Sequence, residues 1–276
     1  MVAPFFLFLL VLLVYPLCFV IYVSLNQMGI SGKGAFIGAG NYAKILADKS
    51  FWHAIWITTK FTILTLSSSM IAGVCLAMVF NSVDFPGKKV VMGLIMIPML
   101  MTPASIGLLW QQLFNPMFGV LNRVLTTLSL PTSLWVSSSH TSLASVAIVA
   151  FWRVTPFILL VSNAGLSMIP QELYDAGKVD GANVLQQLIY ITIPSLRNLL
   201  VIVFIFQMVT VIKTFETIFI MTYGGPADST RTIYLYTYLS TFEYGKVGYG
   251  SALGLILFLI ILGLSYLSIR ARKGLE

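Results

Sequence analysis

The chain has 276 residues, of which 58% are hydrophobic and only 9% carry a charge. Ordinary soluble domains carry roughly 25% charged residues, so this composition excludes a soluble globular protein and indicates an integral membrane protein. The formal net charge of +7 would suggest nucleic-acid binding in a soluble chain. Here the basic residues are spread over the segments between apolar runs, where anionic lipid headgroups are the simpler partner, and no nucleic acid is expected.

The apolar runs predict an all-α fold, a polytopic helical bundle in the membrane. Most runs reach the about 20 residues that a helix needs to cross the hydrocarbon, and they lack the alternation of barrel strands. We place six transmembrane spans at residues 3–25, 54–80, 90–114, 142–166, 199–221 and 248–269. No repeat or linker divides the chain, so residues 1–276 are predicted to form a single transmembrane domain.

The distribution of basic residues predicts how the chain is threaded. The short loop at 81–89 carries Lys88 and Lys89, and the C-terminal tail is basic, so the positive-inside rule favours both termini in the cytoplasm. The longer segments at 26–53, 115–141 and 222–247 would then lie outside. This topology puts the segment at 168–198 in the cytoplasm.

The segment at 168–198 is the longest polar interruption that still has the marks of folded structure. Pro170 suits a first helical turn, and Glu172 and Asp175 lie where a helix dipole favours acids. Gly181 can end this helix, and a second short helical run is expected to stop at Pro194. Two helices joined by a glycine elbow favour a docking element over a flexible tether.

Polar residues interrupt the apolar pattern of two spans. They are Trp152, Arg153 and Thr155 in the fourth span, and Gln207, Thr210, Lys213 and Glu216 in the fifth. Charges at such depth are costly by at least about 2 kcal/mol each, so these residues should face the bundle interior or water.

Four of these residues are open to different interpretations. Lys213 and Glu216 are three residues apart on one helical face, which fits an internal salt bridge as well as a place on a solute path. Arg153 has no acid near it in the sequence, which favours a role in holding a polar ligand. Trp152 is either a packing aromatic or a platform for a sugar ring.

Motifs for catalysis, nucleotide hydrolysis and metal binding are absent from the sequence. There is no G-x-x-x-x-G-K-[ST] phosphate loop, G-x-S-x-G elbow or H-E-x-x-H helix, and both histidines stand alone. We therefore predict no catalytic residue and no metal site. The chain is expected to be a transporter subunit, a channel or a receptor component, and not an enzyme.

The polar segment resembles the EAA signature of the inner-membrane permeases of bacterial ATP-binding-cassette (ABC) importers. That signature reads E-A-A-x-x-x-G, followed about nine residues later by I-x-L-P. It stands here as Asp175-Ala176-Gly177-Lys178-Val179-Asp180-Gly181 and Ile191-Thr192-Ile193-Pro194, and Ile169-Pro170-Gln171-Glu172-Leu173-Tyr174 extends it as in the sugar branch. Asp175 replaces the usual Glu and Gly177 the second Ala, and the glycine weakens a helix by about 1 kcal/mol.

The resemblance implies a type I importer permease that forms a sugar or oligosaccharide pathway in a bacterial or archaeal cytoplasmic membrane. Thr222-Tyr223-Gly224-Gly225-Pro226 is similar to a stretch of the maltose-system "F" permease, which implies a heterodimer with a "G"-type permease. The other implied partners are two copies of an ATPase, which would hold ATP and Mg, and an extracytoplasmic solute-binding protein. This chain would bind no cofactor itself.

The resemblance also assigns roles to residues. Those expected to couple the chain to the ATPase are Glu172, Tyr174, Asp175, Ala176, Gly177, Asp180, Gly181 and Pro194. The polar residues of the fourth and fifth spans are candidates for the solute path. Glycerol phosphate, a polyamine or another small polar solute remains an alternative cargo, and an ion-coupled transporter or channel is a more distant alternative.

Overall fold

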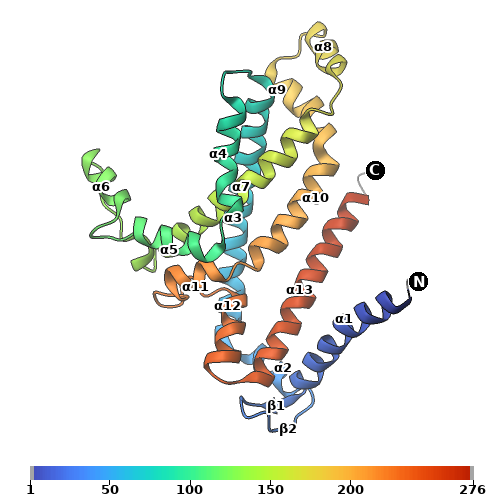
Figure 1. Ribbon diagram of the computed structural model, residues 1–276, viewed down its shortest axis with the longest axis vertical. Helices are drawn as coiled ribbons and strands as arrows, with labels where there is room; N and C mark the ends of the chain where they lie inside the picture. Colours follow the sequence, from blue (N-terminus) through green and yellow to red (C-terminus); the bar gives the residue numbers. More distant parts are fainter. Residues whose placement is uncertain (1–2, 274–276) are drawn as a thin grey trace. The chain divides into compact units, whose positions relative to one another are not determined.

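The computed structural model describes residues 3–273, which are helical apart from one short β-ribbon and the connecting loops (Figure 1). The chain divides into two compact units. Unit 1 contains Met1–Thr59 and Arg231–Leu264, and unit 2 contains Lys60–Thr230 and Ser265–Glu276. Residues 1–2 and 274–276 lie outside the described residues, and the single domain over 1–276 stays a prediction.

Unit 1 combines the first part of the chain with a segment near its end. Its elements are α1 (Ala3–Ser24), β1 (Asn26–Met28), β2 (Gly34–Phe36), α2 (Gly40–Ala47), the start of α3 (Lys49–Ser82), α12 (Ile233–Tyr238), the π-helical turn η3 (Leu239–Glu243) and most of α13 (Val247–Lys273). The two strands are antiparallel, with Gln27 opposite Ala35. This ribbon and α12 lie in segments that the sequence predicts only as loops.

Polar side chains hold the loops of unit 1 in place. The buried Asn41 amide on α2 donates to the carbonyl oxygens of Ser24 and Asn26, at 2.8 and 2.9 Å. Thr58 on α3 accepts a hydrogen bond from the backbone N–H of Ile233, which begins α12. Because buried backbone groups need partners, these contacts fix segments that are far apart in sequence.

Asp48, between α2 and α3, is the centre of a second network. Its Oδ2 accepts from the hydroxyls of Tyr236 and Tyr249, the latter at 2.7 Å, and its Oδ1 accepts from the backbone N–H of Ser50 at 2.8 Å. Burial works to raise the pKa of Asp48, but these hydrogen bonds to the charged form leave it below the ordinary value of 3.8. Burial and the Asp48 carboxylate raise the pKa of Tyr236.

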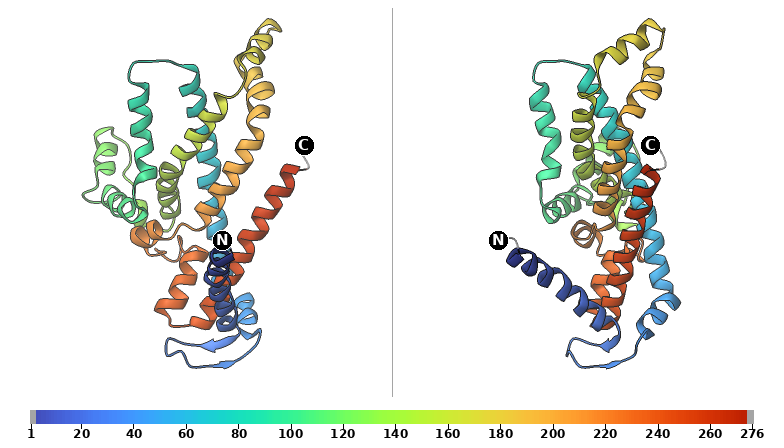
Figure 2. Two further views of the ribbon diagram at one scale, coloured as in Figure 1. Left: turned by 45° about the vertical axis from the view of Figure 1, so that its right-hand side comes forward. Right: turned by 90° about the vertical axis from the view of Figure 1, so that its right-hand side faces the viewer.

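Unit 2 holds the middle of the chain (Figure 2). Besides the rest of α3, its elements are α4 (Lys88–Leu100), α5 (Pro103–Leu113), α6 (Val120–Thr127), η1 (Trp135–Ser137), α7 (Ser142–Leu166), α8 (Gln171–Val179), α9 (Val184–Gln187), η2 (Leu188–Thr192), α10 (Ile193–Ile212) and α11 (Glu216–Thr222). Helices α4 and α10 both pack on α7. In the most apolar stretch of α7 56% of residues are buried, against 17% in that of α10, so α7 is the core helix of the unit.

Four of the six predicted spans are confirmed as single helices: residues 3–25 correspond to α1, 54–80 lie within α3, 142–166 coincide with α7, and 248–269 lie within α13. Within the described residues four helical runs are long and apolar enough to cross a membrane, and α4 with α5 would add a fifth. The number of six spans therefore stays a prediction.

The third predicted span, at 90–114, consists of two helices and not of one continuous helix. Helices α4 and α5 meet at a bend of 101°. Pro103 occupies the first turn of α5, and Thr102 before it is extended and accepts a hydrogen bond from the N–H of Ser105 through its hydroxyl. A residue before proline disfavours helical geometry, so Pro103 starts a new helix where Pro98, inside α4, does not.

The fifth span was also predicted wrongly, at 199–221. The helical run starts earlier, at Val184, and ends at Ile212, with Lys213 as its C-cap. Phe215 is the N-cap of the separate helix α11, which begins at Glu216. Apolar residues resume in α11 after this break, so the apolar run 199–221 was read across the polar residues Lys213 and Glu216.

Replacing Asp48 with Asn is expected to weaken unit 1, because the hydrogen bonds from Tyr236 and Tyr249 would no longer end on a charged acceptor. A loss of roughly 1–2 kcal/mol, and hence a fall of a few degrees in Tm, is expected at neutral pH. Since the folded-state pKa of Asp48 is lowered, the stability advantage of the wild type is present above pH 3.8 and is lost as the pH falls through that lowered pKa.

Thermal unfolding of the purified chain in detergent at several pH values measures this effect. The matched control is Asp84→Asn, because Asp84 is 98% exposed and 4.0 Å from Lys88. Equal Tm values for Asp48→Asn and the wild type at neutral pH would contradict the stabilising role of the network.

Candidate functional site

Helices α8 and α9 form the elbow that the polar segment predicts. Glu172 lies in the first turn of α8, and Pro170 is its N-cap, one residue before the predicted position in the first turn. The helix ends at Val179, and Gly181 adopts a left-handed conformation with φ of +78°, so its predicted role as a helix terminator is confirmed. The backbone N–H of Ala182 then donates to the Gly177 carbonyl at 2.8 Å and closes the turn.

The second helix of the elbow does not stop at Pro194, contrary to the prediction. It begins with a capping box between Asn183 and Gln186 and runs on as one helical segment from Val184 to Ile212. The wider π turn η2 precedes Pro194, and Pro194 lies in the first turn of α10, where its missing N–H is tolerated. The elbow is therefore continuous with a long apolar helix.

Two contacts fix α8 to the base of α10. The Tyr174 hydroxyl lies 3.0 Å from the hydroxyl of the buried Thr192. A Cβ on Gly177 would lie 3.0 Å from the Cδ1 of Ile191, so the small residue lets α8 approach the chain closely before α10. Gly177, which sequence reasoning treats as a weak point of α8, thus gives the elbow its tight packing.

The remaining residues predicted to couple the chain to another protein are on the surface. Glu172, Asp175, Ala176, Asp180, Gly181 and Pro194 are all exposed. The Asp175 carboxylate accepts from Lys178 at 3.0 Å and from Gln171 at 3.4 Å, and the hydrogen bond from Lys178 is the main cause of its lowered pKa. An exposed pair of this kind contributes little to stability and leaves Asp175 available to a partner.

Exposed apolar side chains lie beside these polar residues, and sequence reasoning did not single them out. The most exposed are Val179 at 87%, Val184 at 84%, Tyr190 at 75% and Leu185 at 63%. Contiguous exposed apolar groups in a polar segment are typical of a protein-interaction surface. Their only signal in the sequence is that a segment otherwise rich in polar residues contains them.

A small pocket brings together three of the predicted path residues. Arg153 and residues of α10, namely Gln207 and Thr210, line a cavity of about 110 Å³ together with Met99, Val154, Phe157 and Phe206. Helices α7 and α10 pack side by side, which explains how residues more than 50 positions apart in the chain meet. Whether solute passes this pocket stays a prediction.

Two polar groups of this pocket lack hydrogen-bond partners. The Nε of Arg153 is buried and has no partner within the described part of the chain. Gln207 is only 3% exposed, and its side chain makes no hydrogen bond to another described residue. The Thr210 hydroxyl, by contrast, donates to its own helix, to the Phe206 carbonyl at 2.9 Å. Orphaned buried donors are unfavourable, so water or a polar ligand is expected here.

The other four path candidates lie elsewhere. Trp152 and Thr155 border a separate, mostly apolar cavity of about 480 Å³ against α4, and the Thr155 hydroxyl donates to the Phe151 carbonyl. The Trp152 ring packs on that of Trp110, with centroids 5.5 Å apart. Trp152 and Arg153 do not share a pocket, because the side chains of consecutive residues in a helix point in different directions.

The predicted single helical face for Lys213 and Glu216 is wrong. The helix break places Lys213 at the end of α10 and Glu216 at the start of α11, where an acid is favourable to the helix dipole. Both side chains are exposed, and no ion pair joins them in the described structure. The three-residue spacing has no meaning once the helix ends between them.

Comparison with known proteins gives a family match over most of the chain. Residues 69–272 match the model of the family described as "Binding-protein-dependent transport system inner membrane component". The matched range includes α7, the elbow and α10, which carry both candidate sites.

Individual relatives resemble the chain over nearly its whole length. It is 32% identical to the sulfoquinovosyl glycerol transport system permease protein of Agrobacterium fabrum, over 94% of this chain and 84% of that protein. It is 27% identical to the trehalose/maltose transport system permease protein of Thermococcus litoralis, over 99% and 92%. It is 29% identical to the arabinooligosaccharides permease protein of Bacillus subtilis, over 98% and 86%.

Solved structures show the same fold. A chain of a bacterial alginate ABC transporter, crystallised with an alginate pentasaccharide-bound periplasmic protein, matches with a TM-score of 0.84 at 19% identity, over 97% of this chain and 91% of that chain. The all-helical permease architecture of ABC importers is therefore the architecture of this chain.

Replacing Tyr174 with Phe is expected to loosen α8 from α10, because the hydrogen bond to the Thr192 hydroxyl is lost. A loss of about 1 kcal/mol corresponds to roughly fivefold faster local opening, which hydrogen–deuterium exchange of the amides at 171–192 measures. Tyr190→Phe is the matched control, since Tyr190 is 75% exposed. Equal exchange in the two variants would show that the contact does not fix the elbow.

Proposed function

Because the chain belongs to the family of binding-protein-dependent transport system inner membrane components, we propose that it is the permease subunit for a sugar or oligosaccharide in an ATP-driven importer. Family membership makes it a multi-pass inner-membrane protein and a non-enzymatic transport component, and it does not favour a transporter that acts alone. The observation that carries the choice of solute is the similarity, over nearly the full chain, to permeases named for carbohydrates.

The proposed assembly contains a second, "G"-type permease, two copies of an ATPase that hold ATP and Mg, and a solute-binding protein outside. The elbow supports the ATPase contact, because it offers a rigid surface of exposed acids and apolar side chains. The proposed topology keeps both termini in the cytoplasm, on the same side as the elbow. Lys88 and Lys89 in a short loop support it.

The connection between the elbow and the pocket suggests how ATP hydrolysis would drive transport. Closure of the ATPases would move α8, and Tyr174 and Thr192 would pass this movement to the base of α10. The same helix carries Gln207 and Thr210, about four turns farther on, and packs on α7 beside Arg153. A rigid helix that links the two sites fits alternating access by rocking of packed helices.

The chemistry of the pocket suits a hydroxylated solute. Arg153 offers several donors in a planar fork, and Gln207 adds both a donor and an acceptor. A positive charge with no acid beside it argues against a polyamine. Trp152 faces a different cavity, so stacking of a sugar on this ring finds no support in the pocket that contains Arg153.

Replacing Arg153 with Ala is expected to reduce ATP-dependent sugar uptake by about tenfold or more, because charged hydrogen bonds to the solute are worth about 1.5–3 kcal/mol. Uptake into proteoliposomes that contain the whole complex, with the binding protein's own ligand, measures this. Arg123→Ala is the matched control, because Arg123 is exposed on α6. Wild-type uptake kinetics in an intact Arg153→Ala complex would remove Arg153 from the solute path.

Reversing the charge of Asp175 tests the elbow. Asp175→Lys removes an exposed acid and puts a second positive charge beside Lys178. Recovery of the ATPase on co-purification is therefore expected to fall severalfold. Asp84→Lys, in the loop at 81–89, makes the same charge change away from the elbow. Equal recovery from both variants, with unchanged uptake, would contradict the docking role of α8.

A further inference from the structure

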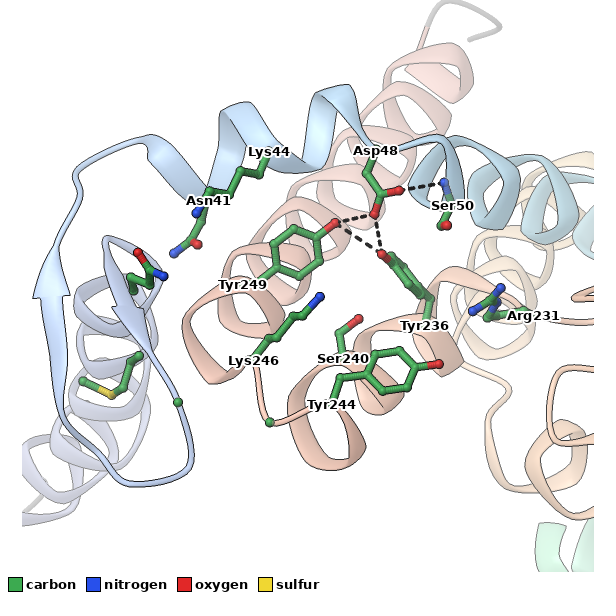
Figure 3. Close-up of a pocket in the computed structure, with 14 residues that line it drawn as sticks. Asn41, Lys44, Asp48, Ser50, Arg231, Tyr236, Ser240, Tyr244, Lys246 and Tyr249 are labelled. Carbon is green, nitrogen blue, oxygen red and sulfur yellow. Dashed lines mark hydrogen bonds between the residues drawn. The ribbon is translucent and has the colours of Figure 1, made fainter.

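Unit 1 contains a pocket of about 740 Å³ that none of the sites described above uses. Residues of β1, α2, the start of α3, α12, the η3 turn and the start of α13 line it, together with residues of the loops between them (Figure 3). A volume of this size suits a ligand as large as a disaccharide. Among the lining residues are Lys44, Asp48, Arg231, Tyr244, Lys246 and Tyr249.

The charges around this pocket do not balance. Three cations and a single acid line it. The acid, Asp48, already accepts hydrogen bonds on both carboxylate oxygens, from Tyr236, Tyr249 and Ser50. Both carboxylate oxygens therefore already accept hydrogen bonds from other residues of unit 1. No ion pair joins Asp48 to a lysine within the described residues.

The two lysines are the cations with the least local compensation. Lys44 and Lys246 make no side-chain hydrogen bond or ion pair with any described residue. Lys44 lies in the last turn of α2, where a cation is favourable, but Lys246 directly precedes α13, where a helix dipole disfavours one. In Figure 3 the Lys246 side chain points into the space between Tyr249 and Tyr236.

The third cation is held by an aromatic ring. The Arg231 guanidinium lies over the Tyr236 ring, with its central carbon 5.7 Å from the ring centroid. This contact orients the planar group at the pocket wall. The Tyr244 hydroxyl and the two ammonium groups line the same pocket and add further hydrogen-bond donors.

We propose that this pocket binds an oxyanion carried on a hydroxylated small molecule, such as the carboxylate of an acidic sugar or the phosphate of a lipid headgroup. Lys44, Lys246 and Arg231 hold the anionic group, and the tyrosines and the polar backbone of the β1 strand contact the hydroxylated part. The proposal concerns unit 1 alone and does not depend on which solute the importer carries. It stands or falls separately from the role of Arg153.

Calorimetric titration of glucuronate into the purified full chain, in nanodiscs of phosphatidylcholine, tests the soluble form of this ligand. Binding is expected, with an affinity that falls as salt is added, and glucose, which lacks the carboxylate, should bind at least about tenfold more weakly. The double variant Lys44→Gln/Lys246→Gln should lose at least about tenfold in glucuronate affinity. The matched control Lys33→Gln, exposed in the same unit and outside the pocket, should retain it.

Native mass spectrometry of the same proteins from mixed phosphatidylglycerol and phosphatidylcholine nanodiscs tests the lipid form. Retention of phosphatidylglycerol by the wild type and Lys33→Gln, but not by the double variant, with no glucuronate binding, would assign the oxyanion to a lipid headgroup. Equal binding of glucose and glucuronate, undiminished binding by a double variant, or binding of neither probe would overturn the proposal. An unchanged Tm of the double variant shows that its fold is intact.

Discussion

The helical continuity from Val184 to Ile212 is the constraint on which the rest of unit 2 depends. A proline in the middle of a helix usually breaks it, yet here the π turn before Pro194 absorbs the missing hydrogen bond. Without this turn, a helix break at Pro194 would separate the elbow from α10. With the π turn in place, a displacement of α8 would be passed along the continuous helix to Gln207 and Thr210 beside Arg153. Packed helices shift as rigid bodies, because their cores do not deform continuously.

Unit 1 depends on polar side-chain networks. Besides buried apolar residues such as Ile45 and Leu235, polar contacts such as those of Asn41 and Asp48 hold its loops together. The carboxylate oxygens of Asp48 all accept hydrogen bonds from neutral donors, and no lysine forms an ion pair with them in the described residues. The same network that orders α12 and α13 thus leaves the nearby lysines without a paired acid.

Hydropathy predicts the membrane class and four spans well, because a long apolar helix is dictated by local composition. It fails where a helix ends inside a long apolar stretch, at Thr102 before Pro103 and at Lys213, and where a π turn lets a helix pass Pro194. The meeting of Arg153 with Gln207 follows from the packing of α7 on α10, which no local pattern encodes. The β-ribbon and the unit 1 pocket are formed by long-range contacts, which the periodicity of the sequence does not predict either.

The two polar cavities differ in how their charge is compensated, and this separates their roles. In unit 2 one guanidinium faces a space of about 110 Å³, with an amide and a hydroxyl beside it. A space of this size would hold only a part of a sugar at a time, which suits the weak, transient contact proposed for a pathway. In unit 1 three cations surround about 740 Å³. Transport requires release as well as binding, so a larger and more strongly charged pocket is better suited to holding a ligand than to passing one.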